Sequence, residues 1–117
     1  MTDPLLQRKY VYIAGPYSSP DPDLNTERAI PPFIKLIEEG FAPFLPHLCI
    51  TADRLSPHNY EFWMQYCFDQ LRRCDALLRL PGDSPGADRE VAFAEELGIP
   101  VYYSLNHFLR LNKLEGD

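Results

Sequence analysis

Residues 75–103 read DALLRLPGDSPGADREVAFAEELGIPVYY, and this stretch decides the fold. A short apolar run at 75–80 ends at a Pro-Gly pair, and a second apolar run occupies 100–103. Both runs have the length and composition of buried strands. The segment between them reads as a helix that begins after a small polar residue and is ended by Gly98. Short apolar strands joined by a helix are typical of neighbours in a parallel sheet.

Strands and helices alternate along the rest of the chain. Apolar runs predict further strands at 9–15 and 41–45, whereas 48–59 is irregular. Helices are predicted over 60–73 and after Ser104, where apolar residues recur at steps of three and four. Because the strands are too short and apolar to be half exposed, both faces of the sheet are covered. We therefore predict a small doubly wound α/β domain, a flavodoxin-like or Rossmann-like three-layer sandwich with four to five parallel strands.

The helix between the first two strands has two possible starts. Residues 18–25 read as a loop because Pro, Ser and Asp interrupt them, and Gly40 ends the helix. Pro31 and Pro32 interrupt its pattern. Either the helix begins near Ala29, with the prolines in its first turn, or a longer helix kinks at them.

Length and charge restrict the function. The 117 residues suffice for one hydrophobic core, so we expect a single domain over 1–117 with frayed ends at 1–8 and 113–117. The net charge is −6 and the basic residues do not cluster, which argues against a nucleic-acid surface. No apolar run is long enough to span a membrane, and no signal peptide is recognised. We expect a cytoplasmic protein with no membrane or nucleic-acid partner.

The three cysteines indicate free thiols in a reducing compartment. Cys49, Cys67 and Cys74 are odd in number and have no paired spacing, which argues against a disulfide framework. His47 and Cys49 are close in sequence, but no second ligand pair follows at metal spacing. We therefore expect no metal and no other cofactor.

Three segments of the predicted sheet meet at its carboxyl edge, where ligands bind in folds of this kind. They are Gly15-Pro16-Tyr17-Ser18, Pro46-His47 and the run at 81–86. The run continues as Ser84-Pro85-Gly86-Ala87-Asp88-Arg89-Glu90, in which a helix begins at Ser84 and a carboxylate follows one turn later. Free N–H groups at a helix start can hold an anion, and Glu90 would face the same cleft.

The same residues also have ordinary structural explanations. Ser84 and Gly86 can be a helix cap and a flexible turn, and an acidic residue in a first helical turn stabilises the helix dipole. Asp88 can serve that purpose, which leaves Glu90 free for chemistry.

Three motifs in order resemble the nucleoside 2-deoxyribosyltransferase superfamily. They are Tyr12-Ile13-Ala14-Gly15-Pro16-Tyr17, Cys74-Asp75-Ala76-Leu77-Leu78 and the Ser-x-Gly-x-x-x-Glu pattern at 84–90. The resemblance covers residues 10–103 and is greatest to small members of the superfamily. These are the 2′-deoxynucleoside 5′-phosphate N-hydrolases, CMP hydrolases of nucleoside-antibiotic pathways, and uncharacterised phage and bacterial relatives.

The resemblance implies a site and a reaction. Glu90 matches the glutamate that attacks the anomeric carbon, and Tyr12 matches a tyrosine whose hydroxyl lies near it. Ser84 and Gly86 match residues that hold a 5′-phosphate, while Gly15, Pro16 and Tyr17 match the loop under sugar and base. The implied activity is cleavage or exchange of the N-glycosidic bond of a nucleoside or nucleoside 5′-monophosphate. Small relatives also assemble as homodimers or larger homo-oligomers.

One position departs from the family pattern. Where relatives often carry an aspartate that assists the leaving base, this chain has Cys67, and Asp69 faces another side of the helix. His47 is a candidate substitute and a candidate substrate-binding residue, although a turn histidine explains it as well. The departure favours a non-catalytic nucleotide-binding module of the same fold, and the intact motif at Glu90 favours an enzyme.

Two aromatic residues of the third predicted helix have a simpler explanation than base stacking. Tyr60 and Trp63 lie on the apolar stripe of that helix, which favours a place in the core.

Overall fold

Four parallel strands form one sheet at the centre of the molecule. The computed structural model describes residues 8–17 and 19–112. The expected frayed ends lie outside this part of the chain, except for residue 8. The sheet has the order β2-β1-β3-β4, and its strands are β1 (Tyr10–Ala14), β2 (Ala42–Phe44), β3 (Ala76–Arg79) and β4 (Val101–Tyr102). The predicted α/β class and parallel sheet are confirmed.

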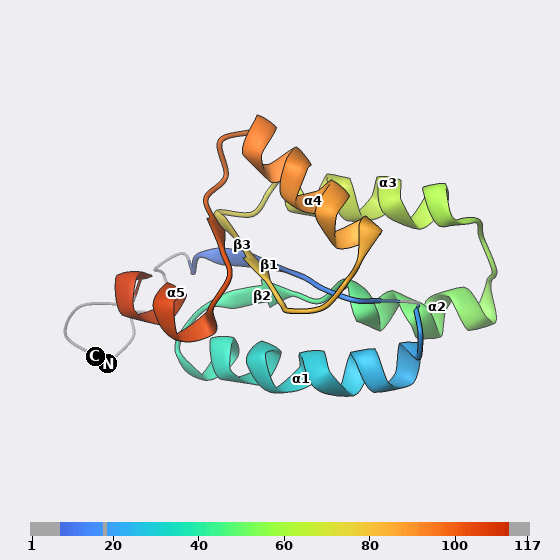
Figure 1. The fold of residues 1–117 in the computed structure, drawn as a ribbon, viewed down its shortest axis with the longest axis horizontal. Coiled ribbons are helices and arrows are strands. Elements are labelled where there is room, and N and C mark those ends of the chain that lie inside the picture. Colours follow the sequence, from blue (N-terminus) through green and yellow to red (C-terminus); the bar gives the residue numbers. More distant parts are fainter. Residues whose placement is uncertain (1–7, 18, 113–117) are drawn as a thin grey trace.

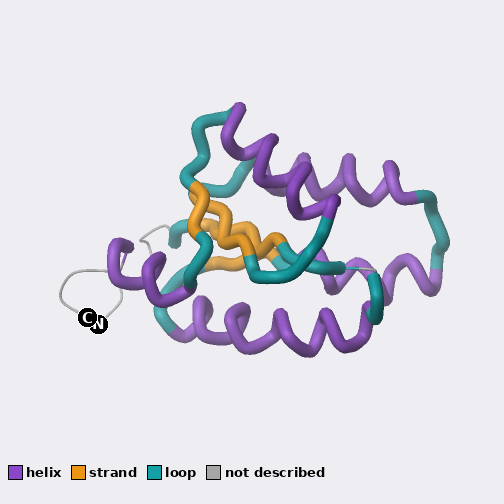
Figure 2. Tube along the Cα trace, in the orientation of Figure 1, coloured by secondary structure: helices purple, strands orange, loops and turns teal. Residues whose placement is uncertain are grey.

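Helices cover both faces of this sheet (Figures 1 and 2). On one face lie α1 (Pro22–Glu38) and α5 (Leu105–Asn112), and on the other lie α3 (Tyr60–Leu71) and α4 (Pro85–Glu96). A 3₁₀ turn (Pro46–Leu48) and α2 (Cys49–Leu55) occupy the segment read as irregular. No helix in the described ranges is long and apolar enough to cross a membrane.

Side-chain alternation along β1 divides the core into two clusters. Val11 and Ile13 pack toward α1 and α5, where Phe108 fills the centre of the cluster. Tyr12 and Ala14 point to the opposite face, toward α3 and α4. All four side chains of this alternation are fully buried, as expected for a central parallel strand. A tyrosine hydroxyl is thereby placed inside the layer between the sheet and α4.

The first helix is the longer of the two alternatives, and it starts inside the segment that was expected to be a loop. It begins at Pro22, because the Asp21 carboxylate accepts hydrogen bonds from the N–H groups of Asp23 and Leu24 at 3.1 Å each. This cap and a proline in the first turn stabilise a start within the segment read as a loop. The helix also continues through its two internal prolines. Their lost hydrogen bonds would have gone to carbonyls of Glu27 and Arg28, which lie on the exposed side.

The order of the strands positions a ligand site. The chain moves from β1 to β2 on one side and then crosses to β3 on the other side of β1. In doubly wound sheets, the loops that leave the strands on either side of such a reversal separate and form a crevice. Here those loops follow Ala14 and Arg79, at the carboxyl ends of β1 and β3.

Candidate functional site

A cavity of about 570 Å³ opens at this crevice, beside the first turns of α3 and α4. Its size is within the usual range for small-molecule sites. It gathers segments that are far apart in the sequence, and its wall includes Gly15, Tyr17, Ser19, Pro46, His47, Tyr60, Trp63, Met64, Cys67, Asp83, Ser84, Gly86, Arg89 and Glu90. Six of the eight predicted site residues are in this set. The other two, Tyr12 and Pro16, lie directly behind it.

Glu90 and Tyr12 form a buried hydrogen-bonded pair in this wall. The Tyr12 hydroxyl donates to Glu90 Oε2, and the two residues are 0% and 5% exposed. Burial raises the pKa of Glu90 to about 7, against the hydrogen bond from Tyr12 and the positive charges of Arg79 and Arg89. Burial also raises the pKa of Tyr12 well above its ordinary value. Near neutral pH the tyrosine is therefore a fixed donor, while the carboxyl group is close to its titration midpoint.

The start of α4 offers fewer anion-binding donors than its sequence suggests. Ser84 is the N-cap, and its hydroxyl oxygen accepts from the Ala87 N–H at 3.1 Å. Pro85 has no N–H group. Within the described chain, the Gly86 N–H is the donor of the first turn that has no recorded partner. An anion at this helix start needs further donors from side chains.

Tyr60 and Trp63 lie in the cavity wall and not in the core. Tyr60 is 52% exposed, and a Cβ on Gly86 would lie 3.0 Å from its hydroxyl oxygen. The buried stripe of α3 begins one turn later, at Met64. The first turn of this helix extends beyond the sheet. Tyr60 and Trp63 therefore line the cavity, although the apolar pattern of the helix predicts that they are buried in the core. The Arg89 guanidinium lies 5.6 Å from the centroid of the Tyr60 ring.

His47 is held by the loop after β1. Its Nε2 donates to the Pro16 carbonyl oxygen at 2.6 Å, so this nitrogen carries the proton. Burial lowers the pKa of His47, which keeps the ring neutral at physiological pH. Its Nδ1 is buried without a hydrogen-bond partner in the described part of the chain. This geometry positions His47 beside Tyr17, with ring centroids 5.5 Å apart, and gives it no proton to donate from Nδ1.

Cys67 lies at the position where the resemblance described above predicts an aspartate. It is buried in the cavity wall, while Asp69 is exposed. The pKa of Cys67 is raised, mainly by a hydrogen bond with the Cys49 thiol and also by burial, so the Cys67 thiol stays protonated. Within the described ranges, no group of three His, Cys, Asp or Glu side chains could hold a metal ion.

Comparison with known families gives the chain its classification. A family model described as "Domain of unknown function (DUF7768)" matches residues 9–104. The chain belongs to DUF7768. No curated protein matches it.

Two solved structures of similar fold are 2-deoxyribosyltransferases. The enzyme from Leishmania mexicana matches with a TM-score of 0.61 and 22% identity, over 80% of this chain and 61% of that protein. The enzyme from Bacillus psychrosaccharolyticus matches with a TM-score of 0.55 and 20% identity, over 79% of this chain and 69% of that protein. This DUF7768 chain thus spans about 61% of the length of the first enzyme. The likeness shows a shared fold.

Sequence analysis assigns no role to Arg89 or Asp83 and expects Tyr60 in the core, yet all three line the cavity. Tyr60 and Arg89 form part of the cavity rim, and Asp83 is the second carboxylate in the described lining. The position of Asp83 inside the run at 81–86 is the one signal that could have marked it. The two others come together because α3 and α4 lie side by side, a contact between positions 29 residues apart.

Proposed function

We propose that the protein cleaves or exchanges the N-glycosidic bond of a nucleoside or nucleoside 5′-monophosphate, with Glu90 as the nucleophile. The observation that carries this proposal is the buried Tyr12–Glu90 hydrogen bond in the wall of a ligand-sized cavity. A carboxylate in a site that excludes water stabilises the positive charge that develops on a sugar during glycosidic cleavage. The fold shared with two 2-deoxyribosyltransferases adds support.

The proposed reaction has two steps. A Glu90 oxygen forms a bond to the anomeric carbon, and the C–N bond breaks with its electron pair going to the base. Water or another base then bonds to the same carbon, and the ester bond breaks to return the carboxylate. Because the attacking group must be ionised, activity rises with pH through the Glu90 pKa of about 7. Tyr12 orients the carboxylate by donating to Oε2.

The remaining predicted residues bind the substrate in this proposal. Gly15 and Tyr17 lie on one side of the cavity, with His47 held next to them through the Pro16 carbonyl. Gly86 and the Ser84 cap lie on the other side, where a 5′-phosphate can accept from the Gly86 N–H.

Neither His47, the candidate substitute for the missing aspartate, nor Cys67 itself is a suitable acid for the departing base. His47 is neutral, with its Nε2–H bound to Pro16, and the Cys67 thiol has a raised pKa. In this proposal the base takes its proton from water, which favours substrates whose base leaves readily. The same lack of a donor is the observation that favours the alternative, a nucleotide-binding module without catalysis.

Release of free base from purified protein tests the proposal. A panel of nucleosides and 5′-monophosphates is incubated with the protein, and the free base is followed by chromatography. Glu90→Gln should reduce release by a factor of roughly a thousand or more. Glu96→Gln, an exposed glutamate of the same helix, is the matched control and should leave release unchanged.

Two results would contradict catalysis by Glu90. Release that persists in Glu90→Gln points to another nucleophile. If no base is released but a nucleotide raises the Tm of the wild-type protein, the binding module is correct.

We also propose a homodimer or larger homo-oligomer and a cytoplasmic location. The free state of Cys49, Cys67 and Cys74 supports a reducing compartment. An aromatic surface next to the cavity, which includes Phe62, Trp63 and Tyr66, supports self-association.

A further inference from the structure

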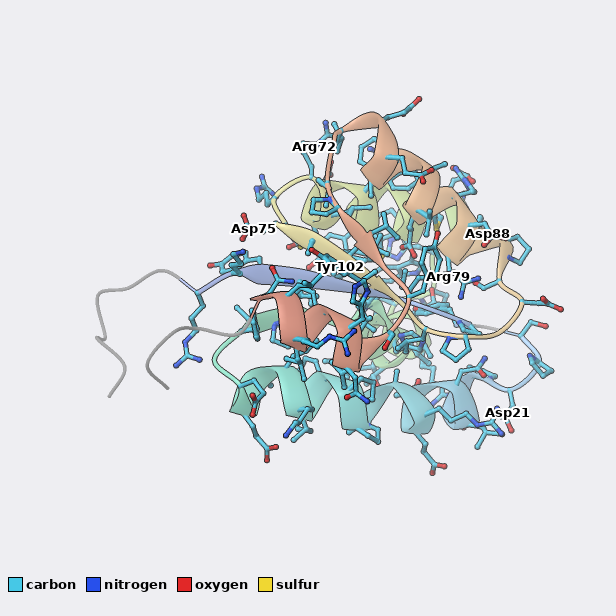
Figure 3. All side chains as sticks on the ribbon, turned by 60° about the vertical axis from the view of Figure 1, so that its left-hand side comes forward. Asp21, Arg72, Asp75, Arg79, Asp88 and Tyr102 are labelled. Carbon is cyan, nitrogen blue, oxygen red and sulfur yellow. The ribbon has the colours of Figure 1, made fainter. Side chains whose placement is uncertain are left out.

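Arg79 ends β3 directly below the first turn of α4. Its strand register places it opposite Ala14, on the sheet face that carries Leu77 and packs against α3 and α4. The side chain is only 10% exposed. Figure 3 shows Arg79 and Asp88 close together, at the end of the strand and on the neighbouring helix. Burying a charged side chain is costly unless hydrogen-bond acceptors or an opposite charge compensate for the lost water, so the partners of Arg79 must be identified.

The Arg79 guanidinium connects the end of β3 to the loop that follows it and to α4. It donates to the Leu80 carbonyl, to the Gly82 carbonyl at 3.0 Å and to Asp88 Oδ1 at 3.1 Å. Leu80 and Gly82 belong to the loop between β3 and α4, and Asp88 belongs to the first turn of α4. The fork of one arginine therefore fixes the path of the loop that leads to Ser84.

The fixed loop is also packed against the loop after β1. Gly82 has φ +116°, and a Cβ there would lie 2.7 Å from Pro16 Cγ. Arg79 contacts the carbonyl of this same glycine. The loop after β1 and the loop after β3 therefore touch at Pro16 and Gly82, and Arg79 fixes the position of Gly82.

Several titratable or charged groups influence Glu90 from the elements packed around it. They are Tyr12 on β1, Tyr17 in the loop after β1, Cys67 on α3, Arg79 on β3 and Arg89 on α4. The two arginines are the cations of this set. Arg89 is 42% exposed and paired with Glu61 at 2.7 Å, so water and its partner screen its charge. Arg79 is the more buried cation, with a side chain 10% exposed that leaves the same sheet face as Tyr12, and its ion-pair partner Asp88 is 72% exposed.

We propose that Arg79 is a positioning residue of the cavity, which fixes the loop between β3 and α4 and supplies the buried positive charge that stabilises the ionised Glu90 carboxylate. The importance of Arg79 for catalysis rests on the proposed function, in which the Glu90 nucleophile must be charged. Its effects on the loop and on the ionisation of Glu90 do not depend on any reaction. Arg79 is not among the residues that line the cavity.

Three variants separate the two parts of this role. Arg79→Met removes the charge and the fork, whereas Arg79→Lys keeps the charge but cannot make the same three hydrogen bonds. Arg73→Met removes an exposed arginine at the other end of β3 and is the matched control for the change in net charge. Circular dichroism establishes that each variant is folded, and Arg79→Lys remains informative if the methionine variant is not.

Two measurements that need no activity report on the variants. The ionisation of Glu90 is followed by ¹³C NMR of its carboxyl carbon, assigned with Glu90→Gln. We expect the midpoint to rise by about half a pH unit or more in Arg79→Met and to stay near the wild-type value in Arg79→Lys and Arg73→Met. Hydrogen exchange of the amides at 80–88 should accelerate in both Arg79 variants and not in Arg73→Met.

The outcomes distinguish this proposal from the proposed function. If Glu90 titrates in Arg79→Met as it does in the wild type, the electrostatic role is refuted. Unchanged exchange at 80–88 in both Arg79 variants refutes the bracing role. If both effects occur but no nucleoside is cleaved by the wild type, the role of Arg79 holds and the proposed reaction fails. If cleavage occurs, its low-pH limb in Arg79→Met must move up with the NMR midpoint.

Discussion

Burial of the Glu90 carboxyl group has opposite consequences for folding and for the proposed reaction. Its pKa is raised from 4.5 to about 7 by burial. Its contribution to stability is therefore complete below about pH 4.5 and is lost as pH rises through about 7. We predict that Glu90→Gln, which keeps an acceptor for Tyr12, raises the free energy of unfolding at pH 8 by up to about 3 kcal/mol and changes it little at pH 4. Urea unfolding at both pH values measures this.

A second glutamine variant is the control for this pH dependence. Glu96 is exposed on the same helix, so Glu96→Gln should shift stability by less than about 0.5 kcal/mol at either pH. A stability difference between Glu90→Gln and wild type that is the same at pH 4 and pH 8 would contradict a raised Glu90 pKa. A confirmed difference would mean that the protein gives up stability for a chargeable group in its core.

Replacing Cys67 tests whether an acid at this position assists departure of the base. We predict that Cys67→Asp speeds release of poorly leaving bases and also adds a limb to the pH profile, in which activity falls at high pH. Two carboxyl groups in one buried site do not ionise together, so the pair shares one proton over a wide pH range, and loss of this shared proton removes the acid that assists the base. The pH–rate profile measures both effects. Cys67→Ser keeps the size without the acid, and an equal gain in that variant would refute acid assistance.

At the scale of elements, the Tyr60 side chain of α3 lies against Gly86 of α4. A Cβ on Gly86 would lie 3.0 Å from the Tyr60 hydroxyl oxygen, so Gly86→Ala should displace the Tyr60 ring at the cavity rim. We predict that it weakens nucleotide binding about fivefold, or roughly 1 kcal/mol, as measured by calorimetry. Tyr60→Phe in the same chain removes the oxygen and should restore most of the loss. Wild-type affinity in Gly86→Ala, or no recovery in the double variant, would contradict a role for this contact.

The sequence predicts those elements whose signals are local. Apolar runs locate the four strands, and a serine followed by proline locates the start of α4 at Ser84. The start of α1 was missed because the cap at Asp21 is a single side chain inside a segment rich in turn residues. Two internal prolines left open whether the helix is short, starting near Ala29, or longer with a kink. Packing of α1 on the sheet outweighs the hydrogen bonds they remove, and sequence periodicity does not report that balance.

Some features of the candidate site can also be predicted from local sequence signals, and others cannot. Glu90 and Ser84 lie in one short motif, and the rule that ligands bind at the carboxyl edge of a parallel sheet brings Gly15 and His47 to the same cavity. The environment of Glu90 depends on residues from distant elements, such as Tyr12 of β1 and Arg79 of β3. The pairing register of β1 and β3 determines where these residues lie, and the sequence pattern of a single element does not contain this register.

For the whole molecule, an aromatic surface continuous with the cavity suggests how copies associate. It consists of Phe44, His58, Phe62, Trp63 and Tyr66, whose rings contact one another in sequence. Phe44 belongs to β2, an edge strand of the sheet, and Trp63 also lines the cavity. Large apolar groups in contact on a surface mark interaction sites more often than isolated ones do. A second copy seated there would lie against the open side of the cavity.

This arrangement predicts that the aromatic surface mediates self-association. Phe62 and Tyr66 are 46% and 42% exposed, so Phe62→Glu and Tyr66→Glu introduce charges that a buried interface must desolvate. Each should convert a wild-type dimer to a monomer at micromolar concentration, measured by light scattering. Leu97→Glu, at a similarly exposed position at the end of α4, is the matched control and should remain dimeric. Dimers that persist in both glutamate variants would place the interface elsewhere, and a wild-type monomer at all concentrations would refute association itself. Loss of base release together with the dimer would show that the second copy completes the cavity.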